Sequence, residues 1–190
     1  AAAAISYTGL TADNIYYFRV KRASDNNSAY AQNQLSTATY AAAPSGVYFI
    51  SNYFTANSSY SASVNLGWNT NGNPEWTDYI VSYSTSGGLA GAASFLEPFP
   101  PVDIGGLKAN TTYYFKVKAV NLYGNSTADT AIISTATLAL KLSGVDTAVH
   151  ETSATVSWTP VSSSTQAQTS EGYQLVLSSS PIFANTVIFW

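Results

Sequence analysis

The chain has 190 residues, of which 46% are hydrophobic and 14% aromatic, so it can build one or two packed domains. Only 9% of the residues are charged, against about 25% in ordinary soluble domains, and the net charge is -3. This composition excludes the basic surface that nucleic acid or an anionic membrane requires, so we expect neither nucleic-acid binding nor membrane insertion.

Cysteine and methionine are absent. The lack of cysteine excludes disulfide and thiol chemistry, and no run of about 18 apolar residues predicts a transmembrane helix. Because even the first residue is not methionine, we expect a processed or partial product in which residues 1–4, all alanine, are either genuine or placeholders. The polar but charge-poor composition favours an extracellular or cell-surface location.

The front segment, residues 1–40, begins with a strand predicted within residues 9–23 (GLTADNIYYFRVKRA). Apolar side chains recur there at every second position, as in Tyr16, Phe18 and Val20, which is typical of a half-buried β-strand. A polar turn at 24–28 and a closing strand near 31–39 follow. Three or more strands with a hydrophobic face, or packing against a helix, are needed for independent stability, so we expect this two-stranded segment to be part of a larger sandwich.

The middle domain, residues 41–138, follows a small-residue linker at 41–46 and holds seven predicted strands. An Asn-rich stretch at 69–74 predicts a turn between two of them. The strands are expected at 47–56, 61–69, 76–84, 92–96, 102–104, around 113–119 and at 130–137. Seven short strands without a convincing helix are typical of a β-sandwich.

The sequence repeats itself at a period close to 100 residues. Residues 106–120 (GLKANTTYYFKVKAV) repeat residues 9–23 after 97 positions, and the tripeptide Thr37-Ala38-Thr39 recurs 98 positions later as Thr135-Ala136-Thr137. This period is too long for a solenoid unit and indicates tandem domains.

The back segment, residues 139–190, restarts the pattern of the middle domain. Ser45-Gly46-Val47 recurs as Ser143-Gly144-Val145, and the alternation that ends in Trp68 recurs in a strand that ends in Trp158. The alternation of Tyr79, Val81 and Tyr83 recurs in the same way as Tyr173, Leu175 and Leu177.

These residues resemble the fibronectin type III family, which has a tryptophan on the second strand, a Tyr-x-Val-x-Tyr-like third strand and a Leu-to-Tyr-x-Phe-x-Val sixth strand. The matching positions here are Trp68, residues 79–83 and residues 107–117. The resemblance implies an all-β fold of tandem immunoglobulin-like (fibronectin type III) β-sandwiches, with a tyrosine corner at Tyr16 and Tyr113. The front copy departs from the pattern, since Asn14 stands where the other copy has Thr111. The expected core residues are Phe18, Val20, Trp68, Phe115, Val117 and Trp158.

The front segment matches the C-terminal half of such a sandwich, and the back segment matches the N-terminal half. Two accounts stay open. In one, the chain is a window of a longer tandem array. In the other, the tail of one copy pairs with the head of the next by strand complementation, and this open head-to-tail contact builds a filament. Both accounts predict a polymer-like assembly in which copies of the chain are each other's partners.

We find no catalytic constellation, no metal-binding spacing and no cofactor motif, so we expect a protein that is not an enzyme. The single histidine, His150, lacks a second histidine or cysteine with which to bind a metal. Glu97 and Asp103 are interpreted as solvated loop charges rather than as paired catalytic acids.

Glycans are a second candidate partner. The outward-facing Tyr17 and Tyr114 are able to stack on sugars, to face a neighbouring subunit or to pack across strands. Four Asn-x-Ser/Thr sequons in predicted turns are candidate N-glycosylation sites, namely Asn26, Asn57, Asn110 and Asn125.

The favoured function is that of a structural surface protein, a building block of an extracellular filament or stalk. The alternative is a spacer or carbohydrate-binding module of a larger secreted enzyme or adhesin. The fold alone does not decide between them, because this architecture hosts many tasks.

Overall fold

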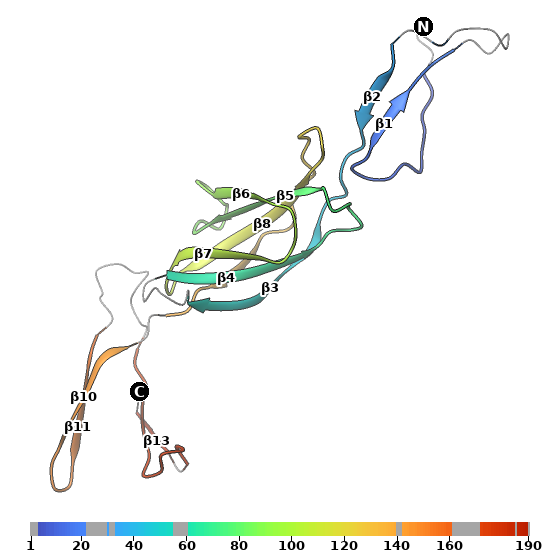
Figure 1. The fold of residues 1–190 in the computed structure, drawn as a ribbon. Coiled ribbons are helices and arrows are strands. Elements are labelled where there is room, and N and C mark those ends of the chain that lie inside the picture. The colour runs from blue at the N-terminus through green and yellow to red at the C-terminus, as the bar shows by residue number, and fades with distance from the viewer. Residues whose placement is uncertain are drawn as a thin grey trace. The chain divides into compact units, whose positions relative to one another are not determined.

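The computed structural model describes residues 4–21, 30, 33–54, 61–139, 142–160, 172–184 and 186–189. Within these ranges the chain is built of strands and turns without a helix, which confirms the all-β prediction (Figure 1). The strands are β1 Ile15–Phe18, β2 Leu35–Ala38, β3 Ser45–Phe54, β4 Ser61–Asn69, β5 Asp78–Ser84, β6 Ala93–Glu97, β7 Val102–Lys108, β8 Thr112–Val120, β9 Ile133–Ala136, β10 Ser143–Val149, β11 Ala154–Thr159, β12 Leu175–Leu177 and β13 Val187–Phe189.

Strands β3 to β9 form the two sheets of the middle domain, which can be followed in Figure 1. One sheet has the strand order β3-β4-β7, and the other has the order β6-β5-β8-β9. Strand β5 pairs antiparallel with both neighbours, so that Val81 lies opposite Phe95 on one side and Val117 on the other. Sheets of three and four antiparallel strands are the arrangement of an immunoglobulin-like sandwich.

The core lies between the two sheets and is made by residues at alternate positions of the strands. Phe115 of β8 and Phe49 of β3 pack edge to face, with 5.6 Å between their ring centroids. Trp68 of β4 packs on Tyr79 of β5, with 5.3 Å between the centroids. These ring pairs join opposite sheets and are worth roughly 0.5–1.5 kcal/mol each beyond the area they bury. Other fully buried side chains are Val64, Leu66, Val81 and Val117.

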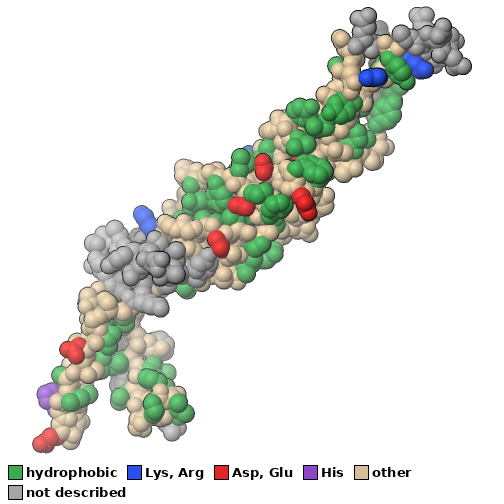
Figure 2. All heavy atoms as spheres, viewed as in Figure 1, with side chains coloured by type: hydrophobic (Ala, Val, Ile, Leu, Met, Phe, Trp, Pro, Cys, Tyr) green, Lys and Arg blue, Asp and Glu red, His purple; other side chains and the backbone are tan. Residues whose placement is uncertain are grey.

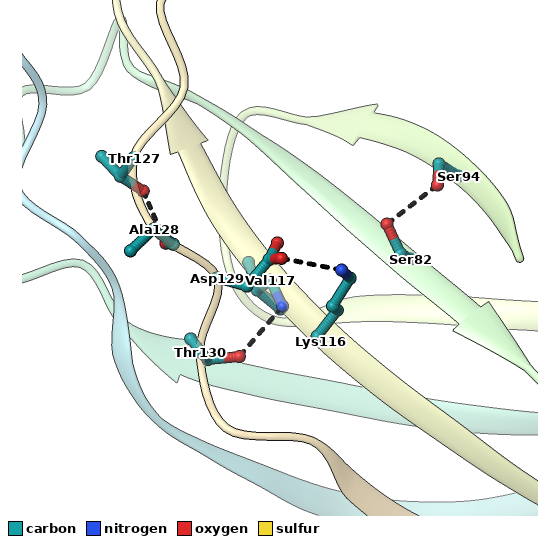
Figure 3. A network of polar contacts seen from close by, with 8 residues as sticks. All are labelled: Ser82, Ser94, Lys116, Val117, Thr127, Ala128, Asp129 and Thr130. Carbon is teal, nitrogen blue, oxygen red and sulfur yellow. Dashed lines mark hydrogen bonds and ion pairs between the residues drawn. The ribbon is translucent and has the colours of Figure 1, made fainter. Parts of the chain in front are cut away.

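The last strand of the middle domain, β9, begins at residue 133 and not at the predicted residue 130. Before that point, two threonine hydroxyls accept the hydrogen bonds that backbone carbonyls would accept in a regular ladder. The Val117 N–H donates to Thr130 Oγ1 at 3.0 Å, and the Ala119 N–H donates to Thr127 Oγ1 at 3.0 Å. Figure 3 shows the first of these bonds beside the ion pair between Lys116 and Asp129. Since side chains make these bonds, the segment is not a regular ladder, and the sequence pattern overestimated the strand.

In the front segment, β1 and β2 form an antiparallel hairpin with Ile15 opposite Ala38. This hairpin corresponds to β8 and β9 of the middle domain. Val20, which the sequence predicted as a core residue, is 73% exposed, whereas the equivalent Val117 is 0% exposed. The prediction is wrong for this chain because, in the part that the structure describes, no second sheet pairs with or covers this end of the hairpin.

The back segment contains two hairpins, β10-β11 and β12-β13, that repeat the first four strands of the middle domain. Trp158 packs on Tyr173 with 5.3 Å between centroids and 58° between planes, close to the 5.3 Å and 56° of Trp68 and Tyr79. The pairing is repeated as well, since Leu175 lies opposite Phe189 just as Val81 lies opposite Phe95.

The chain packs as two compact units. The first comprises Ala1–Ser51, Val64–Ile104 and Thr112–Thr135, and the second comprises Asn52–Ser63, Gly105–Thr111 and Ala136–Trp190. Contacts between the front segment and the loops before β5 and after β8 therefore belong to the first unit. None of the described residues forms a helix with the length and hydropathy needed to cross a bilayer.

The substitution Leu66→Ala should lower the free energy of unfolding of the middle domain by about 2–5 kcal/mol, because it leaves a cavity between the sheets. Leu96→Ala serves as the control, since Leu96 is 60% exposed and its truncation should change the value by less than about 0.5 kcal/mol. Urea denaturation followed by tryptophan fluorescence measures both. Equal losses for the two variants would show that Leu66 is not a core residue.

Candidate inter-domain joint

Asp13 lies in the turn before β1 and is 0% exposed. A buried carboxylate is costly unless it is hydrogen-bonded. Its Oδ2 accepts a hydrogen bond from the Thr77 hydroxyl at 2.7 Å, and its Oδ1 accepts one from the Leu122 N–H at 2.8 Å. Both donors belong to the middle domain, so the carboxylate of Asp13 in the front segment is hydrogen-bonded by residues of the middle domain.

Two further hydrogen bonds hold the backbone around Asp13. The Trp76 indole Nε1 donates to the Asp13 carbonyl at 2.8 Å, and the Asn121 amide Nδ2 donates to the Thr39 carbonyl at 3.1 Å. Trp76 precedes β5 and Asn121 follows β8, so two loops at the same end of the sandwich hold the turn of the front segment. Four directional bonds thus form one joint.

The turn that carries Asp13 is itself held by Thr39. The Thr39 hydroxyl donates to the Thr11 carbonyl at 2.6 Å and accepts from the Asn14 N–H at 3.1 Å. The Asp13 N–H donates to the Tyr40 carbonyl at 3.1 Å. Asp13 has a φ of 45°, in the left-handed region that aspartate tolerates better than most residues. We call this arrangement the threonine clamp. Its bonds lie within the front segment and hold the turn that carries the Asp13 carboxylate.

The predicted tyrosine corners lie next to these turns. The Tyr16 hydroxyl accepts a hydrogen bond from the Thr11 N–H at 2.8 Å, which is the local backbone contact that defines the motif. Hydrogen bonding by Thr11, through its side chain first and its backbone second, lowers the pKa of Tyr16 from its ordinary value. Tyr113, its counterpart, is buried and packs on Phe115 with 6.4 Å between ring centroids.

The linker between the front segment and the middle domain is held by asparagine side chains. Asn73 accepts from the Ala42 N–H at 2.6 Å and donates to the Ala42 carbonyl at 2.8 Å. Asn71 donates to the Ala43 carbonyl at 2.6 Å and accepts from the Ser45 hydroxyl at 3.1 Å. The small-residue linker is therefore pinned along its length to the Asn-rich turn.

Tyr79 supports this turn from below, because its hydroxyl accepts a hydrogen bond from the Asn73 amide at 3.2 Å. Burial raises the pKa of Tyr79, and the charge of Asp13 raises it further to a smaller extent. The Tyr79 hydroxyl consequently stays protonated at neutral pH. Through its bond to Asn73 and its packing on Trp68, Tyr79 connects the Asn-rich turn, and the linker bound to it, with the core.

The sequence predicted the turn at 69–74 but not its role, and it did not single out Asp13 at all. The one available signal was the spacing of Asn69, Asn71 and Asn73, which places three amides at alternate positions. Nothing in a local pattern shows that they face a linker about 30 positions earlier in the chain.

The other predicted surface residues do not gather at the joint. Tyr17 is 65% exposed, whereas the ring of Tyr114 lies against Gly87. Of the four candidate glycosylation sites, Asn110 and Asn125 lie in turns, and Asn26 and Asn57 fall outside the described residues. All four remain predictions. Across the described ranges, no group of three or more His, Cys, Asp or Glu side chains is placed to hold a metal ion.

The substitution Asp13→Ala should open the joint and speed hydrogen exchange of the Leu122 amide by about tenfold to a hundredfold, because it leaves the buried Thr77 hydroxyl without its acceptor, at a cost of about 1–3 kcal/mol. Asp146→Ala is the matched control, since it also removes one carboxylate but from an exposed position in β10. NMR-detected exchange measures both variants. An unchanged rate at Leu122 in Asp13→Ala would rule out the carboxylate as the anchor.

Comparison with known proteins places the middle domain in a family. Residues 51–135 match the model of the fibronectin type III domain. A comparison with curated proteins gave no match.

Solved structures with similarity to the chain include a Fn3-like protein from Clostridium thermocellum, at 24% identity over 53% of this chain and 97% of that one, with a TM-score of 0.36. Domains d3–d4 of the rat CD45 extracellular region give 17% identity over 72% and 70% of the two chains, with a TM-score of 0.40. The FN1–FN3 domains of chicken CNTN1 give 20% identity over 95% and 63%, with a TM-score of 0.33. By the family match, and with seven strands in sheets of three and four, residues 51–135 form a fibronectin type III domain.

Proposed function

We propose that this chain is a structural building block of an extracellular filament or stalk, in which type III-like domains are joined rigidly one after another. The observation that carries the proposal is the joint at Asp13, where a buried carboxylate and the surrounding loops hold the front segment on the middle domain. Fibronectin type III domains are structural or binding modules, and here the buried polar groups serve to connect modules.

A rigid joint suits a stalk because it passes orientation from one domain to the next. A flexible linker of small residues would behave as a random coil and let neighbouring domains reorient independently. Residues 41–44 have the composition of such a linker, but Asn71 and Asn73 bind its backbone at three points. These polar side chains therefore restrict the direction in which the front segment leaves the middle domain.

The apolar faces at the two ends support assembly with further copies. Leu10 of the front segment is 40% exposed, whereas the equivalent Leu107 is 3% exposed. Large exposed apolar side chains of the back segment include Val145, Val149, Leu177, Ile182 and Phe183. Figure 2 shows that hydrophobic side chains reach the visible surface in many places, whereas charged ones are few. Contiguous exposed apolar surface marks an interaction site in most soluble proteins.

The occupant that fits these faces is the complementary half of a second copy. The front segment supplies the counterparts of β8 and β9, and the back segment supplies those of β3 to β6. The back segment of one copy and the front segment of the next would together provide most strands of a sandwich. Because this contact is head to tail, it does not close and leads to a filament. In the window account, neighbouring residues of a longer chain would cover the same faces.

The alternative function, a spacer or carbohydrate-binding module, is favoured by a single observation. Tyr17 projects from β1 with 65% of its surface exposed, as expected of a ring that stacks on a sugar. Sugar binding that disappears in Tyr17→Ala, with assembly unaffected, would support this function over the structural one.

Assembly by complementation should be lost in Val20→Asp, because the substitution places a charge just past the end of β1, in phase with the apolar positions 16 and 18. Tyr17→Asp is the control, since it places the same charge on β1 itself but out of phase with those positions. Light scattering coupled to size exclusion should show a mass that grows with concentration for the unaltered chain and the control, and a constant monomer mass for Val20→Asp. A monomer at every concentration for all three proteins would refute complementation.

A further inference from the structure

The turn between β4 and β5 contains the pair Asn71-Gly72, and Asn-Gly occurs nowhere else in the sequence. Asn71 and Gly72 have φ values of 54° and 77°, and the Asn73 N–H donates to the Thr70 carbonyl at 3.2 Å. Two positive φ values inside a hydrogen-bonded turn of four residues define the type I′ turn, for which Asn-Gly is a preferred pair. The fold therefore favours this pair at the position that also binds the linker.

Asn-Gly is also a pair that deamidates readily, because the glycine has no side chain to hinder the reaction. The backbone nitrogen of the glycine attacks Cγ of the asparagine, the Cγ–Nδ2 bond breaks, and ammonia leaves with the proton of the glycine N–H. Water then opens the resulting succinimide at either carbonyl, which gives aspartate or isoaspartate. A proline after the asparagine prevents this route, since it has no N–H to lose.

The surroundings of Asn71 favour the attack. Asn71 and Gly72 are both exposed, so water reaches the reacting atoms. The Ser45 hydroxyl donates to Asn71 Oδ1 at 3.1 Å, and a donor on this oxygen stabilises the negative charge that develops there when Cγ is attacked. Within the part of the chain that the structure describes, no group accepts a hydrogen bond from the Gly72 N–H. The attack by this nitrogen therefore breaks no hydrogen bond of the turn.

The atom that leaves in this reaction is the one that binds the linker. Asn71 Nδ2 donates to the Ala43 carbonyl at 2.6 Å, and deamidation removes this donor. The carboxylate that replaces the amide has only acceptor oxygens, so it cannot bind the carbonyl and repels it instead. Isoaspartate also lengthens the backbone of the turn by the side-chain methylene, which alters the geometry of the bond between Asn73 and Thr70.

We propose that Asn71 is a deamidation site, and that its conversion to aspartate or isoaspartate releases the linker at Ala43. The chain supplies the nucleophile and the activating hydroxyl, and water is the other reactant. The front segment is then held less firmly on the middle domain, so the stiffness of the joint decreases as the protein ages. The modification takes place within a single chain and does not depend on filament formation.

The first test incubates the full chain at mildly alkaline pH, where the attacking nitrogen is deprotonated more often, and maps its peptides by mass spectrometry over time. The peptide that carries Asn71 should gain the mass of one deamidation and contain both aspartate and isoaspartate. Asn73 is the matched control, since it lies in the same turn but precedes Pro74 and should stay amidated. Equal stability of Asn71 and Asn73 would overturn the proposal.

Ser45→Ala tests whether the folded surroundings contribute. The substitution removes the donor to Asn71 Oδ1 and should slow deamidation by about twofold to tenfold, as expected for the loss of one neutral hydrogen bond. In urea, where the fold is lost, Ser45→Ala and the parent should deamidate at the same rate. A rate that Ser45→Ala leaves unchanged in the folded chain would show that the site is not activated by Ser45.

The second test measures the linker through hydrogen exchange of the Ala42 amide. In Asn71→Asp this exchange should be faster by about twofold to tenfold, because the linker has lost one hydrogen bond. Asn125→Asp introduces the same charge in another exposed turn and should leave the exchange unchanged. The aged parent should show the same acceleration in proportion to its deamidated fraction. An Ala42 amide that exchanges equally in the fresh parent, the aged parent and Asn71→Asp would overturn the release of the linker.

Discussion

The hydrogen bonds that close around the Asp13 carboxylate determine how the front segment is attached to the middle domain. Bonds to an ionised group contribute about 1.5–3 kcal/mol each, and they are directional, unlike apolar contacts. Asp13 receives its two donors from separate loops of the sandwich, so the attached turn is fixed in rotation as well as in position. The threonine clamp and the hydrogen-bonded linker support this contact, because both restrict backbone motions that would move the carboxylate away from its donors.

The composition of the chain agrees with this way of joining domains. Neutral Asn, Thr and Ser side chains make most of the hydrogen bonds described above, and Lys116 and Asp129 form an ion pair in the middle domain. Contacts of neutral groups are screened little by salt, and a buried carboxylate is screened less than an exposed one. The hydrogen bonds at the joint should therefore depend little on ionic strength.

Local patterns predicted the sandwich well and the joint poorly, for a physical reason. The alternation of apolar and polar residues indicates which side of a strand is apolar. It therefore predicted the seven strands and buried residues such as Trp68 and Phe115. It does not report whether a second sheet is present, and Val20 was therefore assigned to a core that the described chain lacks. Asp13 meets Thr77 and Leu122, which lie 64 and 109 positions away, and no local pattern encodes such a pairing.

If the Asp13 carboxylate anchors the front segment, this segment and the middle domain should tumble as one rigid body. Residual dipolar couplings of the amides in β1 and β2, measured together with those in β5 and β8 on the full chain, report whether they do. A single alignment tensor should fit both sets of couplings, with the orientation that the hydrogen bonds define. Two tensors of different magnitude and direction would show that the hairpin moves independently and that Asp13 does not anchor it.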